Sequence, residues 1–79
     1  MTKKTKNEPE VLYFEPEYLK LFMQAVRNAS AQTYISNESI IQKDERSVEI
    51  YPTRAFFLLE VGQQYQKLIQ KKDGAPQST

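Results

Sequence analysis

The chain of 79 residues contains no cysteine, no histidine and no tryptophan, and it has only two glycines. Without cysteine it forms no disulfide, and without cysteine and histidine it lacks the side chains from which structural zinc sites are built. It also has no glycine-rich loop of the kind that cradles a phosphate group. We therefore expect neither a metal ion nor a cofactor.

Long apolar segments are missing as well. No run approaches the roughly 20 apolar residues that span a bilayer, and no apolar run follows the basic N-terminus as it does in a signal peptide. The net charge of +1 differs from that of strongly basic nucleic-acid binders and of strongly acidic mimics. We expect a cytoplasmic protein that does not enter the membrane, and the lack of cysteine fits a reducing compartment.

Catalysis has little support in this composition. Without histidine or cysteine, a hydrolase would need a serine–lysine or a paired-carboxylate mechanism. Glu15 and Glu17 are close in sequence, but they stand at the expected start of a helix, where carboxylates favour the helix dipole. A chain this short also has difficulty enclosing a substrate pocket of several hundred Å³. We therefore expect no enzymatic activity and no small-molecule substrate.

The distribution of apolar residues predicts one domain between two disordered tails. Residues 1–10 hold no large apolar side chain after the initial methionine, and residues 73–79 read as a helix stop followed by a polar segment. The remaining residues, 11–72, form a domain whose own hydrophobic core is marginal. Small domains add disulfides, a metal or another chain. Because the composition provides neither disulfides nor a structural zinc site, another chain is the remaining device. We therefore expect a homodimer or a complex with another protein.

Two segments have the spacing of amphipathic helices. The first covers residues 16–32 and opens with a proline, which suits the first helical position. The second covers residues 53–72, with Thr53 as its expected N-cap. The apolar arc of the first helix is wider than a surface helix needs, which indicates that this helix touches two layers, or one layer and a partner. On the first helix, Ala25 and Ala29 would let another element come close.

Shorter segments favour strands. Residues 11–14 are branched and aromatic, and residues 39–42 and 47–51 flank a polar turn at residues 43–46. This pattern predicts an α+β fold with the order βαββα, in which two helices pack on a small sheet.

The hairpin has a rival interpretation. If Ile41 pairs with Val48 across a four-residue loop, then Ile41, Val48 and Ile50 share one face of the sheet. A short helix over residues 37–46 would instead give a three-helix bundle. Such a helix would have few apolar side chains to bury, which favours the hairpin.

The second helix begins with more apolar surface than one small core can use. Phe57, Leu58 and Val61 fall on its core stripe, whereas Phe56 and Leu59 lie away from it as neighbours at i and i+3. The first strand or the hairpin could fold over this end of the helix, or the pair could anchor a partner. We predict a protein interface at the following residues: Phe56, Leu59, Gln63, Tyr18 and Leu21.

A nucleic-acid-binding regulator is the alternative function. Lys20, Gln24 and Arg27 share the polar face of the first helix and are of the types that read bases and phosphates. Lys67 and Lys71, together with the basic N-terminus, could add phosphate contacts. We favour an ordinary solvated helix face as the explanation of these residues, since lysine, glutamine and arginine are common on protein surfaces. The sequence therefore favours a non-catalytic adaptor, subunit or inhibitor, of a size typical of phage, plasmid or bacterial accessory proteins.

Overall fold

The computed structural model describes residues 8–72 and confirms the predicted α+β fold with the order βαββα. The elements are β1 (Glu10–Tyr13), α1 (Pro16–Thr33), β2 (Ile40–Gln42), β3 (Ser47–Ile50) and α2 (Ala55–Lys72). The hairpin of β2 and β3 stands where the rival interpretation placed a helix, which excludes the three-helix bundle. The predicted tails lie outside the described residues, except for positions 8–10, of which Glu10 belongs to β1.

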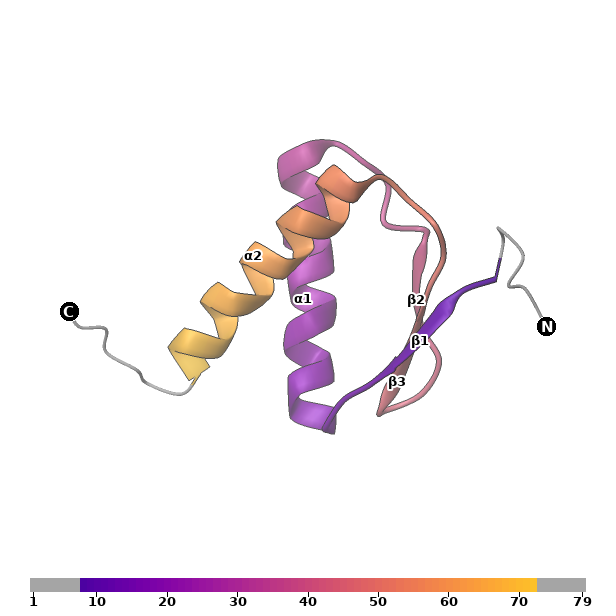
Figure 1. Ribbon diagram of the computed structural model, residues 1–79. Helices are drawn as coiled ribbons and strands as arrows, with labels where there is room; N and C mark the ends of the chain where they lie inside the picture. The colour runs from indigo at the N-terminus through magenta and orange to yellow at the C-terminus, as the bar shows by residue number, and fades with distance from the viewer. Residues whose placement is uncertain (1–7, 73–79) are drawn as a thin grey trace.

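The strands form one antiparallel sheet with the order β1-β3-β2, so β1 and β2 are its two edges. In Figure 1, α2 crosses α1 on one side of the molecule, and the strands lie on the other side. The helices run in opposite directions, because Lys72 Nζ at the end of α2 lies 3.5 Å from Glu17 Oε1 at the start of α1.

The core lies where α1 meets both α2 and the sheet. It contains nine buried apolar residues from four elements: Leu19, Phe22, Ala25, Val26, Ala29, Ile40, Val48, Phe57 and Val61. The two alanines of α1 are fully buried, as expected for small residues at a close approach of elements. An aromatic cluster closes one end of the core, with the ring of Phe14 centred 4.9 Å from that of Phe22 and 5.9 Å from that of Tyr65.

The helix ends follow local backbone chemistry. Glu15 has an extended backbone and makes no side-chain cap, and Pro16 takes the first helical position of α1 as predicted. Tyr34 ends α1 in the left-handed region at φ 61°, and its N–H donates to the carbonyl of Ser30. For α2, the carbonyl of Arg54 accepts the first helical N–H groups, so Arg54 is the N-cap and the prediction of Thr53 was wrong by one residue.

The predicted register of the hairpin was also wrong by one residue. Ile41 lies opposite Glu49 rather than Val48, and it is Ile40 that shares the core face with Val48 and Ile50. Ile40 is 4% exposed, whereas Ile41 on the outer face is 44% exposed. The position of the hairpin was therefore correct, but its inward and outward residues in β2 were exchanged.

The turn that joins β2 and β3 explains this shift. The Asp44 carboxylate accepts hydrogen bonds from the N–H groups of Arg46 and Ser47, at 2.8 and 2.9 Å, and from the Ser47 hydroxyl at 3.0 Å. These bonds, that from Arg46 first, lower the pKa of the Asp44 carboxyl below its ordinary value. The N–H of Lys43 donates to the carbonyl of Ser47, so these two residues close the turn and move the pairing by one position.

Candidate protein-binding surfaces

The exposed side of α2 carries a surface that we call the α2 patch, in which Phe56 and Leu59 are the apolar centre and Gln63 is a polar neighbour. Their spacing of three and four residues places them in a row along the helix. Phe56 and Leu59 are each 61% exposed, whereas the neighbouring Phe57 is fully buried. Neither β1 nor the hairpin covers this end of α2, so within residues 8–72 the two apolar side chains face solvent.

The other two predicted interface residues lie elsewhere. Tyr18 is at the start of α1, with Lys72 Nζ 5.6 Å from the centre of its ring. Phe56 precedes Lys72 by sixteen residues along α2, which corresponds to roughly 24 Å of helix. Leu21 is half-buried on the turn that follows Tyr18. The structure therefore unites Phe56, Leu59 and Gln63 but separates them from Tyr18 and Leu21.

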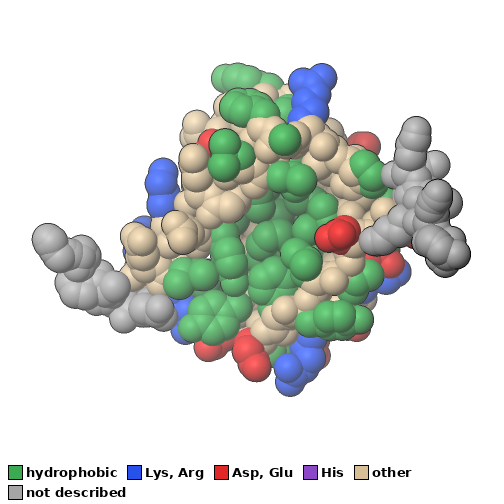
Figure 2. Space-filling view, viewed as in Figure 1, with side chains coloured by type: hydrophobic (Ala, Val, Ile, Leu, Met, Phe, Trp, Pro, Cys, Tyr) green, Lys and Arg blue, Asp and Glu red, His purple; other side chains and the backbone are tan. Residues whose placement is uncertain are grey.

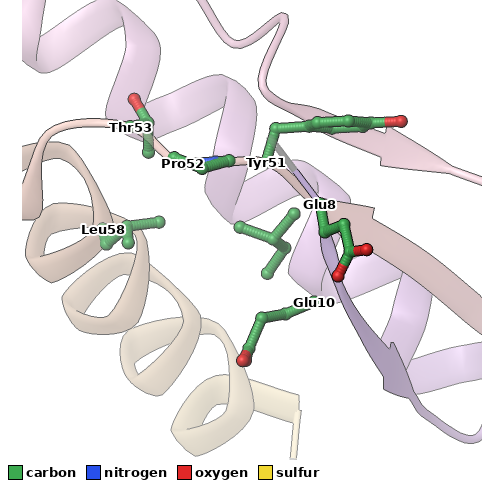
Figure 3. A pocket seen from close by; sticks show the side chains of 7 residues that line it. Glu8, Glu10, Tyr51, Pro52, Thr53 and Leu58 are labelled. Carbon is green, nitrogen blue, oxygen red and sulfur yellow. The ribbon is translucent and has the colours of Figure 1, made fainter. Parts of the chain in front are cut away.

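A second apolar surface lies in the groove between α2 and the strands. In Figure 2, hydrophobic side chains gather in the middle of this face, and charged side chains lie mostly around its margin. One end of the groove is a pocket of about 310 Å³, which Ile50 and Leu58 line together with the chain between β3 and α2. Glu8 and Glu10 stand at its strand side, opposite Leu58 (Figure 3).

Sequence reasoning placed Leu58 on the core stripe of α2, but its side chain is 38% exposed in this groove. Leu58 is exposed because α2 does not cover the neighbouring edge of the sheet, which leaves the pocket between them. Tyr65 lies further along the same side of α2, edge-on to the rings of Phe14 and Phe22. Burial, with Tyr18 nearby as a second cause, raises the pKa of the Tyr65 hydroxyl.

The polar residues of the nucleic-acid alternative lie on both helices, and some of those on α1 are hydrogen-bonded to one another. The Arg27 guanidinium donates to Gln24 Oε1 at 3.0 Å, and the Gln24 amide donates to Asn28 at 3.0 Å, so this row is tied together. Lys20 lines a pocket that it shares with the acidic Glu45. Lys67 and Lys71 are exposed on the other helix.

Comparisons with protein-family models, with curated proteins and with solved structures gave no match to this chain. Between residues 8 and 72, neither helix has the length and apolar character needed to cross a bilayer. The same part of the chain holds no cluster of three or more acidic residues that could bind a metal ion. Any assignment of function therefore depends on the surfaces of the domain itself.

Proposed function

We propose that this protein is a non-catalytic protein-binding module, acting as an adaptor, subunit or inhibitor, and that it holds its partner through the α2 patch. The observation that carries this proposal is the joint exposure of Phe56 and Leu59, at 61% each, on one side of a helix. Covering the exposed part of these side chains would contribute roughly 1–2 kcal/mol each to binding. In a domain of this size, two such neighbours are a substantial unused apolar surface.

The residues around the apolar centre of the α2 patch are of the polar types that surround protein–protein interfaces. Its apolar centre is bordered on the same exposed side of α2 by Gln63, Gln66 and Lys67. An apolar centre with a polar rim is typical of protein–protein contacts. The patch is also part of a regular helix, so little conformational entropy is lost when a partner binds.

Protein binding accounts for the surface better than nucleic-acid binding. The chain has a net charge of +1, and two of its candidate base-reading side chains, Gln24 and Arg27, are hydrogen-bonded to each other. A gel shift at low salt tests the alternative directly, because phosphate contacts weaken steeply as the salt concentration rises. The size and the cysteine-free composition fit a cytoplasmic accessory protein of a phage, plasmid or bacterium.

Affinity capture with matched variants tests the proposal. The full chain, a Phe56→Ser/Leu59→Ser variant and a Gln70→Ser control are immobilised and exposed to an extract of the native host. All three positions are exposed on α2, and Gln70 belongs neither to the apolar centre nor to its polar rim, so the control alters the same helix without altering the interface. We expect proteins that the full chain and the control retain to be lost from the patch variant. Retention of the same proteins by all three would contradict the proposal.

A further inference from the structure

The edge strand β1 has main-chain groups that no other strand uses. The N–H of Phe14 donates to the carbonyl of Arg46 at 2.7 Å, which continues the pairing of Leu12 with Val48. Hydrogen-bonded and non-hydrogen-bonded pairs alternate in an antiparallel sheet. The main-chain groups of Leu12 and Phe14 therefore point towards β3, and those of Val11 and Tyr13 point out of the sheet. Within residues 8–72, no strand pairs with this outer edge.

Apart from the charged Glu10 at its start, the side chains of β1 do little to protect this edge. Natural edge strands are usually blunted by charged residues, prolines or bulges. All four residues of β1 are exposed, and Val11, Leu12 and Tyr13 are apolar or aromatic with a high strand propensity. The opposite edge, β2, has only three residues and is followed at once by Lys43. The edge of β1 is therefore the stronger template for another strand.

We propose that β1 pairs antiparallel with β1 of a second copy of this chain, which joins the two sheets into one. In the register that we assign, Val11 lies opposite the partner's Tyr13, and Leu12 lies opposite the partner's Leu12. The outward N–H and C=O groups of Val11 and Tyr13 on both copies are then all paired. Cross-strand contacts between a branched and an aromatic side chain are favourable in sheets.

Chemistry at the ends of β1 selects this register over its neighbours. A shift towards the N-terminus would pair Tyr13 with the partner's Pro9, which has no N–H to donate. A shift towards the C-terminus would use Glu15, whose carbonyl already accepts the first N–H groups of α1. In the assigned register, Glu10 faces the partner's Phe14, so no two carboxylates stand opposite each other. The strand is therefore complementary to its own copy.

This pairing also explains why apolar side chains are exposed in the groove between α2 and the strands. A twofold axis through the two central leucines is perpendicular to the sheet, so the helices of both copies lie on the same side of it. The apolar side of α2 that carries Leu58 and Tyr65 then borders the partner. At about 100° per residue, Phe56 lies on the opposite side of α2 from Leu58, so the α2 patch stays open. Self-pairing is thus compatible with the proposed function and independent of it.

Sedimentation of proline variants tests the proposal. In Val11→Pro the proline replaces an N–H that points out of the sheet, so the fold is retained and only the intermolecular bond is lost. Gln42→Pro is the matched control, because the bonds of Ser39 and Lys43 to β3 place the N–H of Gln42 on the opposite free edge. We expect a concentration-dependent dimer whose Kd rises at least about tenfold in Val11→Pro and is unchanged in the control.

Three outcomes would overturn the proposal: a monomer up to millimolar concentration, a dimer that both proline variants weaken equally, or a dimer that Val11→Pro leaves intact. A dimer lost in Phe56→Glu but not in Val11→Pro would place self-association on the α2 patch instead. Partner capture by Val11→Pro keeps the two proposals apart, since it depends only on the patch. Circular dichroism of each variant verifies that it is folded.

Disulfide trapping tests the register without relying on a proline. In the assigned pairing the two Leu12 residues form a non-hydrogen-bonded pair with Cα atoms about 4.5 Å apart, which is within disulfide range. The two Val11 residues are about 8–9 Å apart, which is too far. We expect mild oxidation to link Leu12→Cys into a dimer and to leave Val11→Cys unlinked. Equal linking of both, or of neither, would overturn the register.

Discussion

Phe56 and Phe57 are adjacent and chemically identical, yet the structure gives them opposite roles. Phe57 is fully buried among the residues of α1 and the sheet, and Phe56 faces solvent. Replacing Phe57 by alanine should cost roughly 3–5 kcal/mol, because it removes a complete core ring and leaves a cavity. A domain of this length has a total stability of roughly 3–10 kcal/mol, so this variant should be largely unfolded or close to it.

Phe56→Ala should behave differently. About two fifths of that side chain is buried, which corresponds to a loss of roughly 1 kcal/mol. Alanine has the higher helix propensity, which offsets up to about 0.5 kcal/mol of that loss. We therefore expect a net change of less than about 1 kcal/mol, although Phe56→Ala should weaken partner binding more than any other exposed substitution on α2.

Urea denaturation at low protein concentration measures both effects. With a slope of about 1 kcal/mol per molar urea, Phe56→Ala should move the midpoint by less than about 1 M. Phe57→Ala should move it by about 3 M or abolish the transition. Similar losses of stability in the two variants would refute the placement of α2 and, with it, the α2 patch. Low concentration matters because self-association would add to the apparent stability.

Three further predictions concern ionisation and packing. The raised pKa of Tyr65 means that the contribution of its neutral hydroxyl to folding stability is fully present below about pH 10 and is lost as the pH rises through the folded pKa. Tyr65→Phe keeps the ring contacts, so it should lose less stability than the wild type between about pH 9 and 11, as measured by denaturation. The lowered pKa of Asp44 means that its stabilisation is present above about pH 3.8 and is lost as the pH falls through the folded value. Asp44→Ala should therefore speed amide hydrogen exchange in the β2–β3 hairpin at neutral pH, and equal exchange rates would contradict the role of this turn. Ala25→Leu should cost about 1–3 kcal/mol by thermal denaturation, because Ala25 is fully buried in the core, and an unchanged melting temperature would show that there is room beside it.

The periodicity of apolar residues in the sequence was sufficient to predict the two helices and to distinguish the buried side of α2 from its exposed side. The apolar spacing of residues 53–72 separates Phe57 and Val61 from Phe56 and Leu59, and the structure gives them the burial that this spacing predicts. Helix faces are predictable because side chains are related by a fixed rotation per residue. The predicted start of α2 was wrong by one residue, because the hydrogen bonds accepted by the Arg54 carbonyl determine it rather than the capping preference of Thr53.

The register of the hairpin and the order of the strands could not be predicted from the sequence, because they depend on contacts between segments that local patterns do not contain. Two isoleucines in succession leave the inward residue of β2 undecided, and the hydrogen bonds of Asp44 resolve the choice in favour of Ile40. Likewise, nothing in the sequence indicates that β1 pairs with β3 at the edge of the sheet. The exposure of Leu58 beside that edge, and the distance between Tyr18 and Phe56, follow from this arrangement of the elements in space.

Photo-crosslinking at position 56 in the native host is the most direct test of the α2 patch as the partner-binding surface. A benzoylphenylalanine in place of Phe56 keeps an aromatic ring at the centre of the patch, and the same probe in place of Gln70 reports a polar, exposed position on the same helix. We predict a specific adduct with another protein from position 56 and none from position 70. No adduct from position 56, or the same adducts from both positions, would contradict the claim that this protein acts by binding a partner through α2.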